Sequence, residues 1–142
     1  MLELENIVAD NIRTSFEKQQ FLLTFGARLT HVGLGHIEIE APVSHLSLNQ
    51  HGFAHAGLAF AIGDTVAGYA AQSYLPPESD VLTVELKVNY LAPAIGQKLR
   101  GIGRVVRPGG RITVVSAQIF AIDGDTLSKV ALLQGTMLPF AK

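Results

Sequence analysis

The stretch from Phe53 to Leu75 reads FAHAGLAFAIGDTVAGYAAQSYL and contains neither lysine nor arginine over 23 residues. Its length would suffice to span a bilayer, but Asp64 stands near its middle, and a carboxylate at mid-span costs several kcal/mol in lipid. No basic flank orients the stretch in a membrane either. The pattern therefore predicts one long helix that is enclosed by the protein itself.

The segment before this stretch is predicted to begin as a helix and then to form a hairpin. Apolar residues recur three and four positions apart from Leu2 to about Lys18, and the apolar run that follows them stops at Gly26. Alternating runs at Ala27–Val32 and His36–Pro42 flank two glycines, and this arrangement predicts two short antiparallel strands.

The segment after the stretch alternates with a period of two, which is typical of strands. Residues Leu82 to Tyr90 alternate between apolar and polar, so they predict a long strand with one apolar face and one polar face, ending at Pro93. Two further strands are expected to meet at residues 107–110, and two more at residues 123–125. There Asp123-Gly124 favours a hairpin turn with positive φ at both turn positions.

The predicted order is a helix, two short strands, one long apolar helix and four strands, of which the last three form an antiparallel meander. A sheet that curls around the long helix would cover most of its sides. We therefore predict an α+β chain of the hotdog architecture, in which residues 1–142 form a single domain and residues 1–26 form an N-terminal helical segment packed on it. A β-barrel with an incidental helix is the alternative.

Composition narrows the function classes. Apolar residues make up 48% of the chain and charged residues 16%, so we expect a second copy to cover apolar surface in a homo-oligomer. A net charge of -1 gives no basic footprint for nucleic acid. With no cysteine and no metal-ligand spacing among the histidines, we expect no metal and no redox cofactor. The acidic N-terminus does not resemble a signal peptide, and we expect a cytoplasmic protein without a membrane partner.

Asp64 is the first candidate for catalysis, because it is the only charge within the apolar helical stretch. An unpaired carboxylate costs several kcal/mol to bury, so it is seldom placed there without a partner or a task. The alternative is a structural carboxylate that is hydrogen-bonded to a strand or to a partner helix.

The start of the long helix is the second candidate. Residues 52–57 are rich in small side chains, and the first amides of a helix lack internal partners, so they are suited to stabilise a developing oxyanion. Asp64 lies eight residues after Ala56, about 12 Å along a helix, which is too far for one carbonyl group to contact both. If two copies pack their helices antiparallel about a two-fold axis, Asp64 of one copy meets the Ala56–Gly57 end of the other.

Three motifs resemble those of the PaaI-type hotdog acyl-CoA thioesterases of the phenylacetate pathway. Residues 49–64 (NQHGFAHAGLAFAIGD) resemble the family signature N-x-x-G-x-x-H-G-G-x-x-x-x-x-x-D. Residues 84–94 (VELKVNYLAPA) resemble its strand motif V-x-L-x-[VI]-x-Y-[LM]-x-P-A, and Gly110-Arg111 resembles its late glycine-arginine turn. The resemblance extends from about Phe21 to the C-terminus.

This resemblance implies a catalytic set of four residues. The amide of Ala56 would polarise the thioester carbonyl, and Asp64 of the opposing subunit would activate water or attack the carbonyl directly. Asn49 would help to hold the lytic water. Thr83 would assist the carboxylate from the strand.

The resemblance also implies three substrate-binding residues, His55, Gly57 and Arg111. We expect His55 to act as a local hydrogen-bonding residue rather than as a general base. Arg111 would meet the phosphates of coenzyme A, and the alternative for it is a solvated turn residue. The chain departs from the family at Ala56, where glycine is usual; the amide survives this change, but a Cβ now lies near the path of the thioester.

The activity implied is hydrolysis of an acyl- or aryl-acyl-CoA to the free acid and coenzyme A, by a homodimer or a dimer-of-dimers tetramer with shared active sites. One alternative is a hotdog hydratase or dehydratase, which would need a catalytic histidine paired with a carboxylate. The other is a non-catalytic acyl-CoA-binding protein, which the alanine at position 56 would permit.

Overall fold

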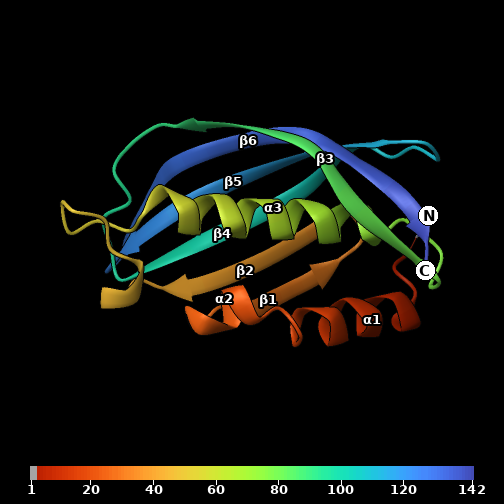
Figure 1. The fold of residues 1–142 in the computed structure, drawn as a ribbon, viewed down its shortest axis with the longest axis horizontal. Coiled ribbons are helices and arrows are strands. Elements are labelled where there is room, and N and C mark those ends of the chain that lie inside the picture. Colours follow the sequence, from red (N-terminus) through yellow and green to blue (C-terminus); the bar gives the residue numbers. More distant parts are fainter. Residues whose placement is uncertain (1–2) are drawn as a thin grey trace.

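The computed structural model describes residues 3–142 and contains one antiparallel sheet and one long helix (Figure 1). The helices are α1 (Asn6–Phe16), α2 (Gln20–Thr24), the short 3-10 helix η1 (His45–Ser47) and α3 (Ala56–Gln72). The strands are β1 (Arg28–Gly33), β2 (His36–Pro42), β3 (Ser79–Tyr90), β4 (Lys98–Arg107), β5 (Thr113–Asp123) and β6 (Thr126–Ala141).

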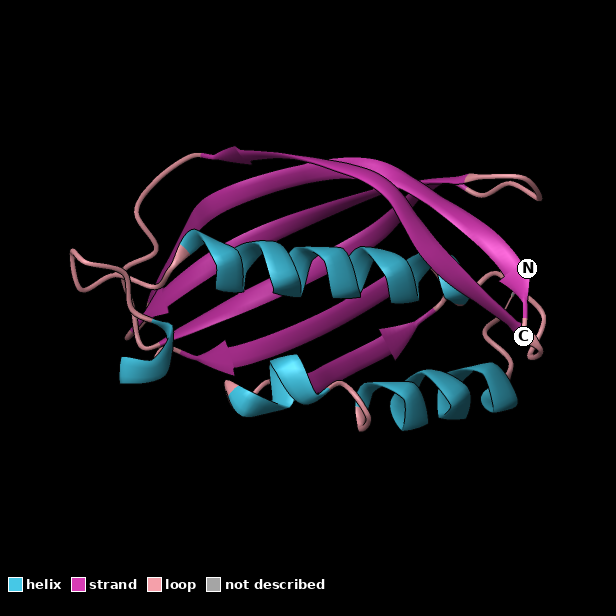
Figure 2. Cartoon of the chain, viewed as in Figure 1, coloured by secondary structure: helices cyan, strands magenta, loops and turns pink. Residues whose placement is uncertain are grey.

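The six strands lie in the order β1-β2-β4-β5-β6-β3, and every neighbouring pair is antiparallel. The predicted hairpin of β1 with β2 and the predicted meander of β4, β5 and β6 are confirmed. Figure 2 shows α3 lying in the hollow of the curled sheet, with α1 and α2 beside the end of the sheet formed by β1. This arrangement is the α+β architecture expected from the sequence.

Helix α3 is shorter than the apolar stretch that predicts it. It has 17 residues, begins at Ala56 and ends at Gln72. Its buried side lies so close to β4 that a Cβ at Gly103 would collide with the backbone carbonyl of Val66. Glycine at this position permits the close approach. Among the described residues, no helix combines the length and the apolar character needed to cross a bilayer.

One face of α3 is not covered by the sheet. Its residues recur three and four positions apart and are exposed or half-buried: Gly57, Phe60, Ala61, Asp64, Thr65 and Gly68. We call this surface the open face of α3. The prediction that the single chain encloses Asp64 is therefore wrong, because the sheet curls over one side of the helix and leaves the carboxylate on the other.

Strand β3 departs from simple alternation because a β-bulge interrupts its pairing with β6 between Thr83 and Glu85. Thr83 reaches α3 and Leu86 packs against the core, although the two are three positions apart. Leu82 and Val84 are 57% and 59% exposed. The prediction that these two residues share an apolar face with Leu86 is wrong, because the extra residue of the bulge reverses the alternation.

The β5–β6 hairpin forms where the sequence predicts it, but its turn differs. The two turn residues are Gly124 and Asp125, and of these only Gly124 has a positive φ, at 58°. Asp123 is the last residue of β5. The expectation of positive φ at both turn positions is therefore wrong, since a single positive φ at the first turn position is typical of a type II′ turn.

The N-terminal segment is helical as predicted, although α1 begins only at Asn6 and Leu2 lies outside the described residues. Its buried side consists of Val8, Ala9, Ile12 and Phe16. Beyond these apolar contacts, the Oη of Tyr69 donates a hydrogen bond to Ser15 Oγ (3.0 Å) and accepts one from Gln19 Nε2 (2.8 Å). These bonds attach the segment to α3.

Candidate active site

The N-terminus of α3 presents one free amide. His55 has an extended backbone, and its Nδ1 accepts a hydrogen bond from the N–H of Gly57 at 2.8 Å, so that it caps the helix. The N–H of Leu58 donates to the carbonyl of His55 at 3.0 Å. Within residues 3–142, no group accepts a hydrogen bond from the N–H of Ala56. This amide is therefore the donor left for a ligand.

The cap also bears on the predicted roles of His55 and Gly57. The imidazole of His55 uses Nδ1 within the chain, which agrees with a local structural role. The N–H of Gly57 is already engaged by that nitrogen. Gly57 can therefore contribute to substrate binding by letting a ligand approach the backbone closely, because it has no side chain. Its assignment as a binding residue stays a prediction.

The loop before α3 is held by the side chain of Asn49. Its Oδ1 accepts hydrogen bonds from the N–H groups of His51 (2.9 Å) and Phe53 (3.1 Å). Gly52 completes the turn with a φ of +80°, which glycine adopts without strain. The side-chain oxygen of Asn49 is thus occupied, and of its side-chain polar atoms only Nδ2 remains to hold a water molecule.

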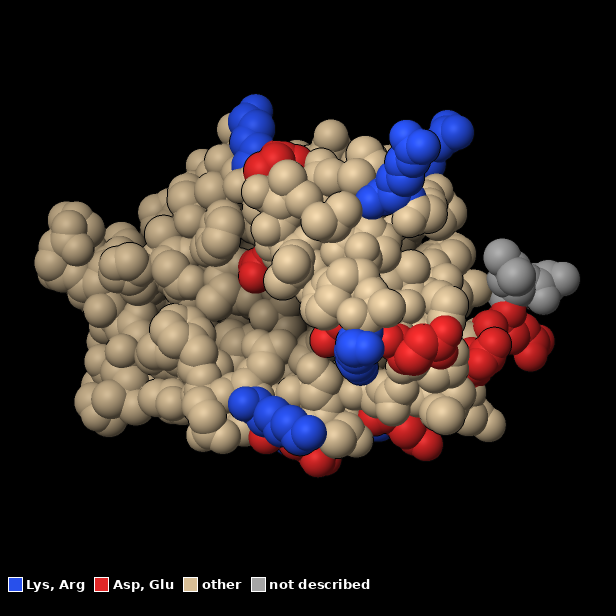
Figure 3. Space-filling view, turned by 45° about the vertical axis from the view of Figure 1, so that its right-hand side comes forward, with Lys and Arg blue, Asp and Glu red and all other residues tan. Residues whose placement is uncertain are grey.

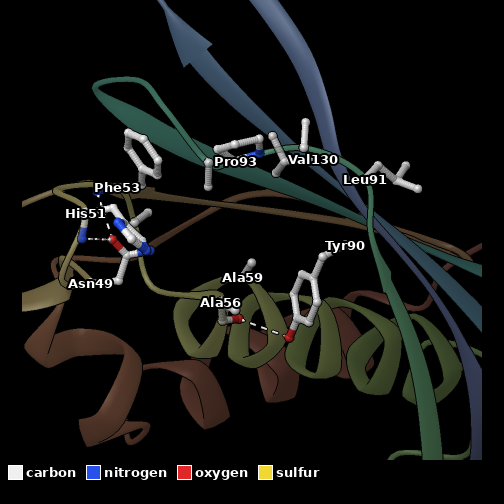
Figure 4. A pocket seen from close by; sticks show the side chains of 12 residues that line it. Asn49, His51, Phe53, Ala56, Ala59, Tyr90, Leu91, Pro93 and Val130 are labelled. Carbon is white, nitrogen blue, oxygen red and sulfur yellow. Dashed lines mark hydrogen bonds between the residues drawn. The ribbon is translucent and has the colours of Figure 1, made fainter.

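A pocket of about 480 Å³ opens beside the free amide of Ala56 (Figure 4). Its lining comes from the loop before α3, the first turn of α3, the end of β3 with the chain that follows it, and β6: Asn49, His51, Phe53, Ala54, Ala56, Ala59, Tyr90, Leu91, Ala92, Pro93, Ala94 and Val130. The Oη of Tyr90 donates a hydrogen bond to the carbonyl of Ala56 at 3.3 Å. Burial raises the pKa of Tyr90, which keeps this hydroxyl protonated as a donor.

The pocket beside Ala56 is poor in charged side chains. None of the residues that line the pocket is Asp, Glu, Lys or Arg, and residues 41–63 and 90–97 contain none of these four types either. Figure 3 shows charged side chains over the rest of the visible surface and a broad area without them on the left. The pocket is therefore suited to an uncharged part of a ligand.

Asp64 and Thr83 form the second part of the candidate site. The Oγ1 of Thr83 donates a hydrogen bond to Asp64 Oδ1 at 2.7 Å, and it also lies 3.4 Å from the sulfur of Met137. In the described part of the chain, Asp64 Oδ2 accepts no hydrogen bond. One carboxylate oxygen is thus held in place while the other is free to contact a water molecule or a substrate.

The structure therefore groups the predicted site residues into separate sets. Asn49 lies with Ala56 in the apolar pocket, and Thr83 lies with Asp64 two helical turns further along α3, about 12 Å from Ala56. Arg111 is exposed in the loop between β4 and β5, which Figure 1 shows at the opposite end of α3 from Ala56. Within one chain these groups do not form a single site.

Sequence reasoning missed two features of this region. One is the bond from Tyr90 to the first residue of α3, for which the sequence offers only the position of the tyrosine in the strand motif. The other is a smaller pocket of about 210 Å³ on the Asp64 side. The single glutamine of the apolar stretch, Gln72, was a signal for this second pocket.

Comparison with known proteins identifies the family. A sequence model described as the thioesterase superfamily matches residues 51–128, more than half of the chain. The chain belongs to the thioesterase superfamily. The match includes the whole of α3 with Asp64, and the strands β3, β4 and β5.

Solved structures of similar proteins agree with this family. A thioesterase family protein from Silicibacter pomeroyi has a TM-score of 0.92 and 36% sequence identity, covering 95% of this chain and 99% of that one. The PaaI protein of the E. coli phenylacetic acid degradation operon has a TM-score of 0.86 at 20% identity, covering 97% and 96%. A Streptococcus mutans protein bound to acetyl-CoA has a TM-score of 0.69 at 28% identity, covering 82% and 90%.

These findings confirm the predicted hotdog fold and the thioesterase family of the resemblance, and the likeness to PaaI is one of fold. The β-barrel alternative is thereby excluded. The roles of Asp64, Asn49, Ala56 and Thr83 stay predictions, which rest on the geometry of this chain.

Proposed function

We propose that the protein is an acyl-CoA thioesterase, which uses water to cleave an acyl-CoA into the free acid and coenzyme A. The observation that carries this proposal is the helix α3 itself. It presents a free N–H at Ala56 beside an apolar pocket and, two turns later, a carboxylate with one free oxygen at Asp64. An amide that stabilises an oxyanion and a carboxylate that activates water are the groups that thioester hydrolysis requires.

The two groups are brought together if two copies of the chain share their sites. Apart from Phe60, the residues around Asp64 on the open face of α3 are small, so a second α3 can approach it closely. Strand β3 lies at the edge of the sheet and, within residues 3–142, pairs only with β6, which leaves its other side free for a second copy. An antiparallel pairing of two α3 helices then places Asp64 of one copy beside Ala56 of the other.

In such a shared site the thioester carbonyl accepts a hydrogen bond from the N–H of Ala56. Asp64 of the partner subunit takes a proton from the attacking water or attacks the carbonyl itself, while Thr83 fixes the orientation of that carboxylate. The amide nitrogen of Asn49 contacts the water. The same pairing brings Arg111 of the partner subunit towards the uncharged mouth of the pocket, where it meets the phosphates of coenzyme A.

The proposal is tested with purified protein and a panel of acyl-CoAs, by measuring the release of free thiol. We expect turnover of at least one acyl-CoA and no hydration of the matching enoyl-CoA. Tight binding of acyl-CoA without thiol release would instead identify a non-catalytic binding protein. Hydration of the enoyl-CoA would identify a hydratase.

Complementation between two inactive variants tests the shared site. Each mixed dimer of Asp64→Asn and Ala56→Pro subunits would carry one site with both lesions and one site with neither. Random re-association makes half of the dimers mixed, so about a quarter of the wild-type activity should return. The measurement is thiol release before and after mixing, with heterodimers verified by differently tagged subunits. Heterodimers without recovered activity would show that each chain builds its own site.

A further inference from the structure

The hydrogen bonds around the start of α3 fix the backbone on both sides of the Ala56 N–H. The N–H of His55 donates to the carbonyl of Ser47 at 2.7 Å, and the carbonyl of His55 accepts from the N–H of Leu58 at 3.0 Å. The next peptide group, between Ala56 and Gly57, is bonded at both of its polar atoms. Within residues 3–142, the N–H of Ala56 is the polar backbone group that these bonds surround and leave without an acceptor.

The peptide group between Ala56 and Gly57 is held by two side chains. The Nδ1 of His55 accepts a hydrogen bond from the N–H of Gly57 at 2.8 Å. The Oη of Tyr90 donates a hydrogen bond to the carbonyl of Ala56 at 3.3 Å (Figure 4). Because a peptide group is planar and rigid, it cannot rotate without breaking these bonds. We call the two bonds together the peptide clamp.

The glycine at position 57 explains why the first turn of α3 needs such a clamp. A Cβ at Gly57 would lie 3.0 Å from Nδ1 of His55, closer than an ordinary contact, so the cap leaves little room for a larger residue. Glycine loses more conformational freedom on folding than any other residue, and the first turn of a helix lacks part of its backbone hydrogen bonds. A second attachment to a rigid element therefore restricts a segment that would otherwise move easily.

Tyr90 supplies this attachment from the sheet. It is the last residue of β3 and pairs with Ala131 of β6, and the N–H of the next residue, Leu91, donates to the carbonyl of Val130 at 2.8 Å. The backbone of Tyr90 is thus fixed by the sheet, while its ring lines the pocket beside Ala56. Within residues 3–142, the hydroxyl of Tyr90 makes one hydrogen bond, to the carbonyl of Ala56. It therefore connects the sheet to the first residue of α3.

We propose that Tyr90 is a positioning residue, which together with the cap by His55 holds the first turn of α3 so that the N–H of Ala56 stays aimed at the oxyanion. The inference rests on the proposed thioesterase function and adds a residue to its machinery. Tyr90 acts through Ala56 and does not itself donate to the substrate. A donor that is fixed beforehand needs no reorganisation in the transition state, so loss of the clamp lowers kcat rather than substrate binding.

The variant Tyr90→Phe tests the clamp, because it removes the hydroxyl and keeps the ring that lines the pocket. We expect kcat for the best substrate of the acyl-CoA panel to fall about fivefold, the size of one neutral hydrogen bond, with KM within about twofold of the wild-type value. The matched control is Tyr74→Phe, at an exposed tyrosine outside this pocket, and it should keep wild-type kcat. A higher KM with unchanged kcat would assign Tyr90 to the pocket wall alone and overturn the inference.

A double variant separates positioning of the amide from a general effect on the fold. If Tyr90 acts through the N–H of Ala56, then adding Tyr90→Phe to an Ala56→Pro protein should change kcat less than about twofold, because no N–H is left to position. An equal loss of kcat in both backgrounds would show that the hydroxyl acts independently of Ala56. That result would also overturn the inference.

Amide hydrogen exchange separates this inference from the function on which it rests. The N–H of Gly57 should exchange about fivefold faster in Tyr90→Phe than in the wild-type protein, while the amides of α1 exchange at unchanged rates. Unchanged exchange at Gly57 and unchanged kcat in Tyr90→Phe would overturn the inference and leave the thioesterase intact. No thiol release from any acyl-CoA would overturn the proposed function and the positioning role with it, whatever the exchange rates.

Discussion

An Asp64→Asn protein is expected to fold normally and to lose at least about 100-fold in kcat, a size typical for a catalytic acid or base. Asparagine keeps the shape of the side chain and still accepts the hydrogen bond from Thr83, which holds Asp64 Oδ1 at 2.7 Å. It lacks the negative charge that takes a proton from water or attacks the thioester. Because Asp64 is only partly buried in the single chain, its neutralisation should not destabilise the fold.

The measurement is kcat for the best substrate of the acyl-CoA panel, together with circular dichroism and thermal unfolding. Asp10→Asn is the matched control, because Asp10 is exposed in a helix and pairs with Arg13 on the surface. It should retain wild-type kcat. A well-folded Asp64→Asn protein with near-normal turnover would assign the chemistry to another group.

An Ala56→Pro protein is expected to lose on the order of 3 kcal/mol of transition-state stabilisation, or roughly 100-fold in kcat, because proline lacks the N–H that would bind the oxyanion. The backbone at position 56 can accept a proline without disturbing the helix. Ala56 is the first residue of α3, a position that proline favours, and its N–H has no acceptor within residues 3–142. The preceding residue, His55, already has the extended backbone (φ -60°, ψ 138°) that a following proline requires.

Two further variants serve as controls. One tests steric crowding by the Cβ at position 56, and the other tests the general effect of a proline at the first residue of a helix. Ala56→Gly keeps the N–H and removes the Cβ near the thioester path, so it should retain or raise activity. Asn6→Pro places a proline at the first residue of α1, after Glu5 with a similar extended backbone (φ -67°, ψ 137°), and should leave kcat unchanged. Full activity in a folded Ala56→Pro protein would rule out the amide as the oxyanion donor.

Much of the fold was predictable because local sequence patterns indicate its helices, strands and turns. The charge-free run around Asp64 predicts α3, the alternating runs predict the strands, and the turn residues near 108 and 124 place the hairpins. Such patterns extend over a few residues, so they can be recognised without knowing which segments pack against them. Helix ends are less well marked, and α3 ends three residues before the apolar stretch does.

The candidate site was predictable only in part. Asp64 and Ala56 stand out in the sequence as a lone charge in an apolar helix and as the start of that helix. The pairing of Thr83 with Asp64 does not follow from the alternation, which places Thr83 on the face opposite to Leu86. Only the bulge between Thr83 and Glu85 turns the threonine towards the helix, and a bulge depends on how β3 pairs with a strand about 50 residues later.

The sequence by itself determined the order of the elements, the apolar helix at the centre and the motif residues of the thioesterase family. The tertiary structure alone decided which atoms remain available for chemistry. The free amide of Ala56 and the free oxygen of Asp64 are known only once every neighbouring donor and acceptor is placed. The physical reason is that periodicity reports which side of an element is buried, whereas hydrogen-bond satisfaction depends on partners that are distant in the sequence.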